Sequence, residues 1–98
     1  MTPRLLLEPE AELDLEGARI WYEERAKGLG SEFLRNVRAT LAVIERQPDL
    51  FPVVHATVRR ANLRRFPYAV YYVAENAVTA VIGCLHTRRD PTIWRSRR

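Results

Sequence analysis

Two neighbouring segments in the second half of the chain are apolar at both odd and even positions. The first spans residues 66–74 and the second runs from Val78 to His86, with Glu75 and Asn76 suited to a hairpin turn between them. A strand that is apolar on both faces must be covered on both faces, which is typical of the centre of a sheet. These segments predict two central antiparallel strands, and the rest of the chain has to cover them.

The first half of the chain has the spacing of two helices. Its apolar residues recur at intervals of three and four, as expected for one face of a helix. Pro9 and the acids after it favour the start of the first helix. Gly28 and Gly30 separate the two repeats, and Ser31 is a candidate cap for the second helix. Pro48 favours the end of the second helix. The sequence therefore predicts an αα-hairpin. The repeats are Ala11, Leu15, Ala18 and Tyr22, then Leu34, Val37, Leu41 and Ile44.

Two shorter segments complete the predicted fold. Arg4 to Glu8 is predicted as a first strand, and the β-branched stretch from Val53 to Arg60 as another, linked to the central pair by residues 62–65. The order β-α-α-β-β-β predicts an α+β fold, with a three- or four-stranded antiparallel sheet and the αα-hairpin on one face. Residues 1–98 are expected to form one domain, whose tail from Asp90 to Arg98 is either a short helical turn or mobile. The expected core comprises Leu15, Tyr22, Leu34, Val37, Leu41, Val70, Tyr72, Ile82 and Cys84.

The composition is that of a globular protein, with 47% apolar and 29% charged residues. No apolar run approaches the roughly 20 residues that span a bilayer, and the segment from Met1 to Glu8 does not have the make-up of a signal peptide. The single cysteine, Cys84, cannot form an internal disulfide. We therefore expect a cytoplasmic protein that does not bind membranes.

Charge is distributed unevenly along the chain. Residues 1–49 hold 7 lysines and arginines against 10 acids, a net charge of −3, whereas residues 50–98 hold 9 against 2, a net charge of +7. All the cations except Lys27 are arginines, whose planar group binds carboxylates and phosphates bidentately. A GC-rich genome is an equally good explanation of the arginine preference. The basic half nevertheless points to an acidic protein or a nucleic acid as partner.

Few residues have the context of a chemical site. His55 and His86 lack the neighbouring ligands of a metal site, and the glycines form no phosphate loop, so neither a metal nor a cofactor is expected. The segment from His86 to Pro91 is more informative, because it ends a buried strand and starts a turn at the rim of the sheet. There His86 is a possible acid or base, and Arg88 and Arg89 are possible phosphate ligands. The alternative is structural, with Asp90 as a cap or an ion-pair partner.

The chain resembles a known family in three segments. These are Arg-Phe-Pro-Tyr-Ala-Val-Tyr-Tyr at 65–72, Val-Ile-Gly-Cys-Leu-His-Thr-Arg-Arg-Asp-Pro at 81–91, and Trp94. Together with the opening strand and Pro-Glu-Ala-Glu-Leu-Asp-Leu at 9–15, they are similar to the RelE/ParE superfamily of type II toxin–antitoxin toxins. The resemblance covers nearly the whole chain. It implies a small acidic antitoxin as partner, whose binding would complement the basic half.

The family contains two mechanisms. RelE-like members cut messenger RNA on the ribosome with basic residues and usually a C-terminal tyrosine, whereas ParE-like members inhibit DNA gyrase without cutting nucleic acid. Here Ala69 stands at a RelE arginine position and Trp94 at the tyrosine position, which favours a ParE-like gyrase inhibitor. The resemblance then implies target-binding roles for Arg60, Arg88, Arg89 and Trp94. The alternatives are a ribosome-dependent nuclease that uses His86 and Arg88, and a small basic domain that binds nucleic acid non-specifically.

Overall fold

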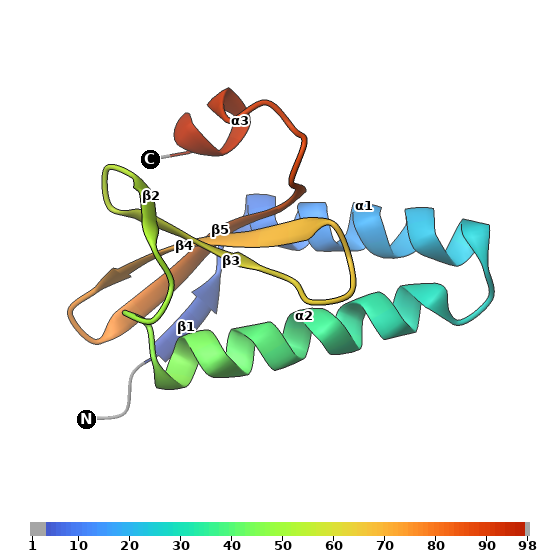
Figure 1. The fold of residues 1–98 in the computed structure, drawn as a ribbon, viewed down its shortest axis with the longest axis horizontal. Coiled ribbons are helices and arrows are strands. Elements are labelled where there is room, and N and C mark those ends of the chain that lie inside the picture. Colours follow the sequence, from blue (N-terminus) through green and yellow to red (C-terminus); the bar gives the residue numbers. More distant parts are fainter. Residues whose placement is uncertain (1–3, 98) are drawn as a thin grey trace.

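The protein is described by a computed structural model that covers residues 4–97 (Figure 1). The α+β fold and the helical hairpin on one face of the sheet are confirmed. Of the expected domain over residues 1–98, positions 1–3 and 98 lie outside the described residues. The elements are β1 (Arg4–Leu7), α1 (Pro9–Arg25), α2 (Leu29–Arg46), β2 (Val53–His55), β3 (Val58–Asn62), β4 (Tyr68–Glu75), β5 (Val78–His86) and α3 (Thr92–Arg95).

The strands form one five-stranded sheet in the order β1-β5-β4-β3-β2. Strands β2 to β5 pair antiparallel, but β1 pairs with β5 in parallel, so the expectation of a purely antiparallel sheet is wrong at this edge. Periodicity shows which side chains face inward, but it does not show the direction of a neighbouring strand that is distant in sequence. The parallel pair joins residues 4–7 to residues 78–81, at opposite ends of the chain.

The segment predicted as a single strand from Val53 to Arg60 is in fact two strands, β2 and β3. A tight turn separates them, and Ala56 adopts a positive φ of 50° there. The β-branched composition of the segment therefore identified strand residues correctly but did not reveal the turn, because alanine is not a residue that marks left-handed backbone.

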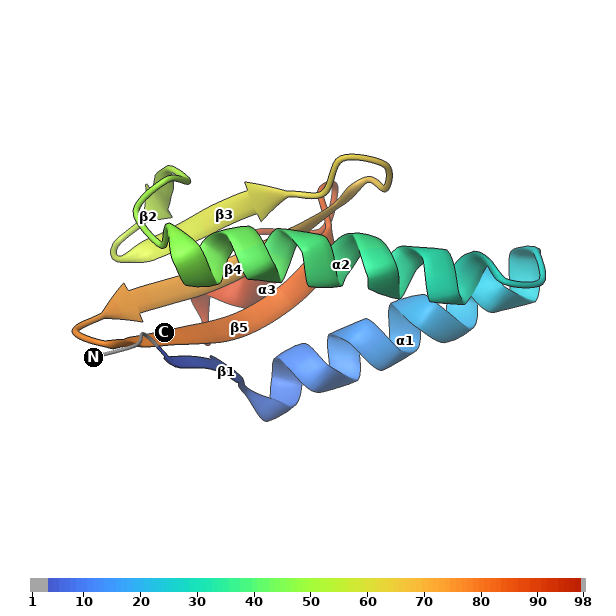
Figure 2. The same cartoon turned by 90° about the horizontal axis from the view of Figure 1, so that it is seen from below.

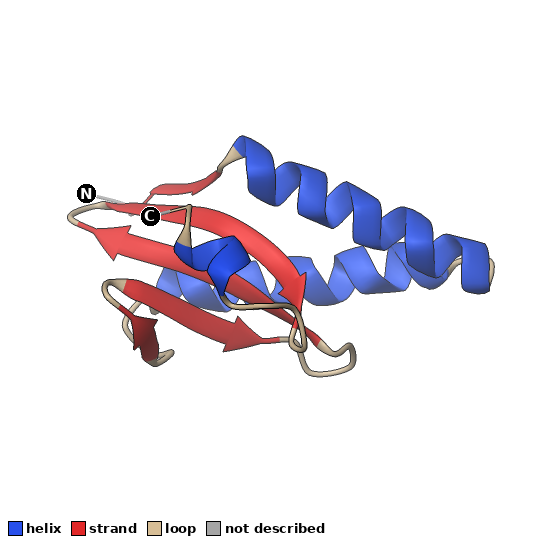
Figure 3. Cartoon of the chain, turned by 90° about the horizontal axis from the view of Figure 1, so that it is seen from above, coloured by secondary structure: helices blue, strands red, loops and turns tan. Residues whose placement is uncertain are grey.

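The sheet is covered on both faces (Figures 2 and 3). Helices α1 and α2 pack on one face, where aromatic rings at positions 22, 33, 66 and 68 contact one another. Helix α3 packs on the other face over a second cluster. This arrangement confirms that the central strands are buried on both sides. The second cluster contains Val58, Ala69, Tyr71, Val73, Ile82, Leu85 and Trp94.

Most of the expected core is buried. Leu15, Leu34 and Leu41 are only half-buried and pack against the edge of the core, because a helix that covers one face of a sheet turns part of its apolar stripe toward the edge of the layer. The six expected residues that are buried are Tyr22, Val37, Val70, Tyr72, Ile82 and Cys84.

The turn between the two helices uses a side chain that the sequence did not indicate. Helix α2 begins at Leu29 with Gly28 as its N-cap residue, at a φ of 86°, so the expected cap Ser31 lies inside the helix. The carboxylate of Glu23 accepts the backbone N–H groups of Gly28 at 2.9 Å and Gly30 at 3.0 Å. These donors hold the pKa of Glu23 below its usual value. A carboxylate from α1 therefore satisfies the amide groups that a capping serine would otherwise satisfy.

Two glycines in the helices should respond oppositely to alanine. A Cβ at Gly17 would meet no atom within 4 Å, whereas a Cβ at Gly30 would lie 2.7 Å from the backbone oxygen of Arg19. We expect Gly17→Ala to raise the free energy of unfolding by about 0.5–1 kcal/mol, because glycine is a poor helix former. Gly30→Ala should lower it by about 1–3 kcal/mol through overpacking between the helices. Urea unfolding of both variants measures these changes, and a stabilised Gly30→Ala would contradict the close approach.

Candidate functional site

Two loops meet at one end of the sheet and form a basic rim. The loop between β3 and β4 and the loop between β5 and α3 lie side by side (Figure 3), joined by a hydrogen bond of 2.9 Å from the Thr87 N–H to the Pro67 carbonyl. We call the four exposed arginines on these loops the arginine rim. Their guanidinium groups can bind phosphates or carboxylates. The rim consists of Arg64, Arg65, Arg88 and Arg89.

His86 lies at the base of this rim, at the end of β5. Its ring packs edge-on against Tyr68, with centroids 5.4 Å apart. Its Nδ1 accepts the backbone N–H of Arg88 at 3.1 Å, and its carbonyl accepts the N–H of Arg89 at 2.9 Å. The imidazole therefore shapes the turn that presents the arginines, and only Nε2 is left to exchange a proton with a ligand.

Asp90 belongs to the turn as well. Its Oδ1 accepts the N–H of Thr92 at 3.0 Å, at the start of α3. Hydrogen bonding to Thr92 holds the pKa of this carboxyl below its usual value. The alternative weighed from the sequence, a structural role for Asp90 as a cap, therefore fits the contact that the structure shows.

Trp94 lies away from the rim. Its side chain is 4% exposed. The indole stacks on Tyr71, with centroids 4.7 Å apart and 18° between the planes, and it meets His55 edge-on at 6.1 Å. Trp94, for which the resemblance implies a target-binding role, therefore lies apart from His86, because the aromatic side chain of α3 packs against the far face of the sheet.

Arg60 also lies apart from the other candidates. It is half-buried on β3, and its backbone pairs with Tyr71. Val58, two residues earlier, belongs to the far-face cluster, so strand alternation places the Arg60 side chain on that face too. The structure therefore brings His86, Arg88 and Arg89 together at the rim and puts Arg60 with Trp94 on the far face.

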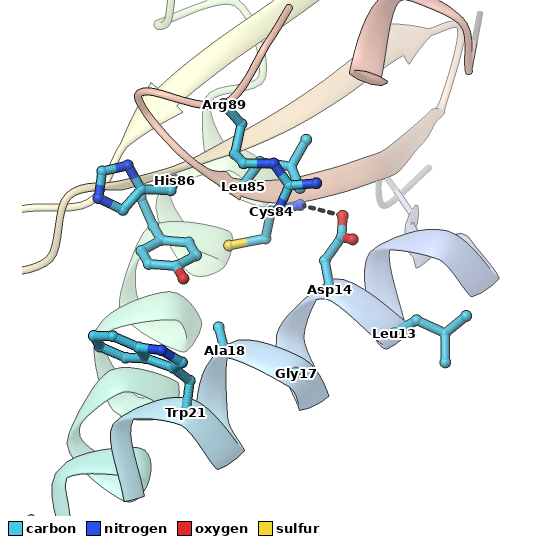
Figure 4. Close-up of a pocket in the computed structure, with 10 residues that line it drawn as sticks. Leu13, Asp14, Gly17, Ala18, Trp21, Cys84, Leu85, His86 and Arg89 are labelled. Atoms are coloured by element: carbon cyan, nitrogen blue, oxygen red, sulfur yellow. Dashed lines mark hydrogen bonds between the residues drawn. The ribbon is translucent and has the colours of Figure 1, made fainter. Parts of the chain in front are cut away.

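A groove opens beside the rim, between α1 and the end of β5 (Figure 4). Its volume is about 290 Å³. Sequence reasoning missed this groove, because its walls come from residues that are far apart in the chain and are unremarkable on their own. It is lined by Leu13, Asp14, Gly17, Ala18, Trp21, Tyr68, Cys84, Leu85, His86 and Arg89.

An ion pair closes one end of this groove. Asp14 on α1 and Arg97 after α3 are 2.7 Å apart. The Asp14 carboxylate also accepts the Cys84 N–H at 3.1 Å, and the Arg97 guanidinium donates to the Ile82 carbonyl at 2.9 Å. A Cβ at Gly83 would lie 2.7 Å from the Arg97 Nη1. Glycine at this position therefore gives the ion pair room to lie against the strand.

Cys84, in the floor of the groove, is not a candidate nucleophile. Burial raises the pKa of its thiol to about 12, so the reactive thiolate is scarce near neutral pH.

Within residues 4–97, no three histidine, cysteine or acidic side chains are grouped as a metal would require. No helix in this range is long and apolar enough to cross a bilayer.

A second hollow lies on the opposite side of the molecule, between α2 and β3. Its volume is about 400 Å³. The buried Asn36 Oδ1, on a residue that lines it, has no hydrogen-bond partner among the described residues. Leu50 in its wall is 58% exposed. The two hollows thus flank the helical hairpin on either side.

Comparison with known proteins finds a likeness in fold. The chain is similar to a chain of the solved structure "Chromosomal ParDE TA system from P. aeruginosa", with a TM-score of 0.75 over 87% of this chain and 96% of that chain. The sequence identity is 13%, so the likeness shows a shared fold. No family model matches the sequence. No curated protein matches it either.

Proposed function

We propose that this protein is the toxin of a type II toxin–antitoxin pair, of the ParE-like kind that inhibits DNA gyrase. The observation that carries the proposal is the fold, which matches a chain of a ParDE toxin–antitoxin system over nearly the whole of both chains. The segments at 65–72 and 81–91, which resemble the RelE/ParE superfamily, support it independently. The toxin would act in the cytoplasm and be neutralised by an acidic antitoxin.

The arrangement of the candidate residues favours gyrase inhibition over messenger RNA cleavage. Cleavage needs a base near the 2′-hydroxyl and a cation near the scissile phosphate. His86 holds the turn through its Nδ1, and Trp94 is buried in the core. The exposed arginine rim suits a different task, which is contact with an acidic protein surface or with DNA phosphates. Nuclease activity by His86 and Arg88 remains the second candidate, because both lie at this rim.

The test measures both activities with matched variants. Purified protein is added to a gyrase supercoiling assay and, separately, to translating ribosomes followed by primer extension. We expect inhibition of supercoiling without codon-specific cuts. Replacing Arg88 and Arg89 by glutamine should weaken inhibition at least about tenfold, the effect of losing roughly 1.4 kcal/mol of binding. The control Arg35→Gln with Arg38→Gln removes the same charge from an exposed face of α2 and should retain inhibition.

Two results would contradict the proposed function, and a third would contradict the role of the arginine rim. Codon-specific cuts that vanish in His86→Ala would establish the nuclease. Equal losses in the two double variants would show that net charge, and not the rim, drives inhibition. Salt-sensitive DNA binding without inhibition or cleavage would leave a non-specific nucleic-acid-binding domain.

A further inference from the structure

Strand β5 is longer than the strand that pairs with its outer edge. Strand β1 pairs with Val78 to Val81 and then turns into α1. Within residues 4–97, the rest of β5, residues 82–86, therefore has strand β4 on one side and no strand on the other. We call residues 82–86 the open edge. Open strand edges expose backbone groups that pair readily with another chain.

Side chains satisfy only the first part of the open edge. Arg97 donates to the Ile82 carbonyl, and Asp14 accepts the Cys84 N–H. Because alternate residues of a strand direct their backbone groups to the same side, the Cys84 carbonyl and the His86 N–H also face outward. Both residues line the groove. The edge thus offers one acceptor and one donor, the pair that an added strand would use.

The opposite wall of the groove is an exposed apolar strip on α1. Leu13 is 74% exposed and Trp21 is 47% exposed. Gly17 lies between them in sequence with open space at its Cβ position. All three are among the residues that line the groove, with the Leu13 side chain turned outward from β5 (Figure 4). Large apolar side chains that remain in contact with water beside a groove are typical of an interaction site. The strip is suited to an apolar side chain from a partner.

The charged residues that line the groove leave one uncompensated cation. Two charged residues line it, and the carboxylate of Asp14 is neutralised by Arg97. The other, Arg89, is exposed at the rim. At the far end of the strip the Arg25 guanidinium lies 3.7 Å from the centre of the Trp21 ring. Arg89 in the lining and Arg25 beside Trp21, with no uncompensated acid among the lining residues, complement a negatively charged segment.

We propose that the groove binds an extended acidic segment of the antitoxin, which adds as a strand to the open edge of β5. This inference rests on the proposed function. The segment pairs with the Cys84 carbonyl and the His86 N–H, places an apolar side chain over Gly17, and directs a carboxylate to Arg89. An extended segment is favoured over a helix, because a helix satisfies its own backbone groups and leaves those of the edge unpaired.

The experiment fills the groove without disturbing the core. Gly17→Trp occupies the open space on α1, and Ala42→Trp introduces the same side chain on an exposed position of α2 as control. Each variant is titrated calorimetrically with the protein encoded beside this gene. We expect Gly17→Trp to weaken binding at least about tenfold, as for a central contact residue, and Ala42→Trp to bind as the unmodified chain does. In the unmodified complex, hydrogen exchange at the His86 amide should slow.

Failures of the two proposals can be told apart. If the unmodified chain does not bind the neighbouring gene product, the proposed function itself is contradicted. If it binds but Gly17→Trp binds equally well, or the His86 amide is not protected, only the groove is contradicted. If sedimentation shows that the unmodified chain is a dimer and Gly17→Trp is a monomer, the groove belongs to a second copy of this chain instead.

Discussion

Replacing Trp94 by alanine is expected to lower the free energy of unfolding by about 3–5 kcal/mol, the range for truncating a large buried aromatic side chain. The indole is the buried residue of α3 and stacks on Tyr71. Its removal leaves a cavity over the far face and releases α3 from the sheet. Urea unfolding followed by far-UV circular dichroism measures the loss.

The control for Trp94 is a conservative substitution. Trp94→Phe keeps an aromatic ring in contact with Tyr71 and should retain much of the stability that alanine loses. A Trp94→Ala protein with unchanged stability but lost gyrase inhibition would contradict the structure, since it would mean that the indole binds the target directly. Loss of inhibition in parallel with loss of stability supports a role in the core.

Phe33→Ala is expected to cost a similar amount, about 3–5 kcal/mol. The Phe33 side chain is fully buried on α2 and contacts three other rings, at distances of 5.2–5.3 Å between centroids. Such aromatic pairs add stability beyond the area they bury. The cluster joins the helical hairpin to the loop before β4, so its loss should weaken the whole helix-covered face. The rings that Phe33 contacts are those of Tyr22, Phe66 and Tyr68.

Leu13→Ala provides the contrast to Phe33→Ala. Leu13 is also a large apolar residue of the hairpin, but it is exposed. Its truncation should change the free energy of unfolding by less than about 0.5 kcal/mol, as for a surface residue. Equal losses in the two variants would contradict the assignment of Leu13 to an exposed strip and of Phe33 to the core.

The local pattern of residues predicted both long helices and the central strands of this fold. The spacing of apolar residues predicted both helices, and the end of α2 before Pro48 is where the pattern put it. The segment from Val78 to His86 is a strand with those same bounds. The spacing of apolar residues predicts these elements because the residues on the buried face of a helix or a strand recur at the period of that element. The predicted rim residues His86, Arg88 and Arg89 are neighbours in sequence, and they stay neighbours in space.

Only the tertiary structure decided the contacts between segments that are distant in sequence. The parallel pairing of β1 with β5, the ion pair of Asp14 with Arg97 and the groove beside Gly17 each join the two ends of the chain. Trp94 follows the rim in sequence, yet α3 folds it onto the far face. A sequence pattern indicates which side chains are buried. Which surface buries each of them depends on how the complete set of elements packs, because apolar contact is not directional.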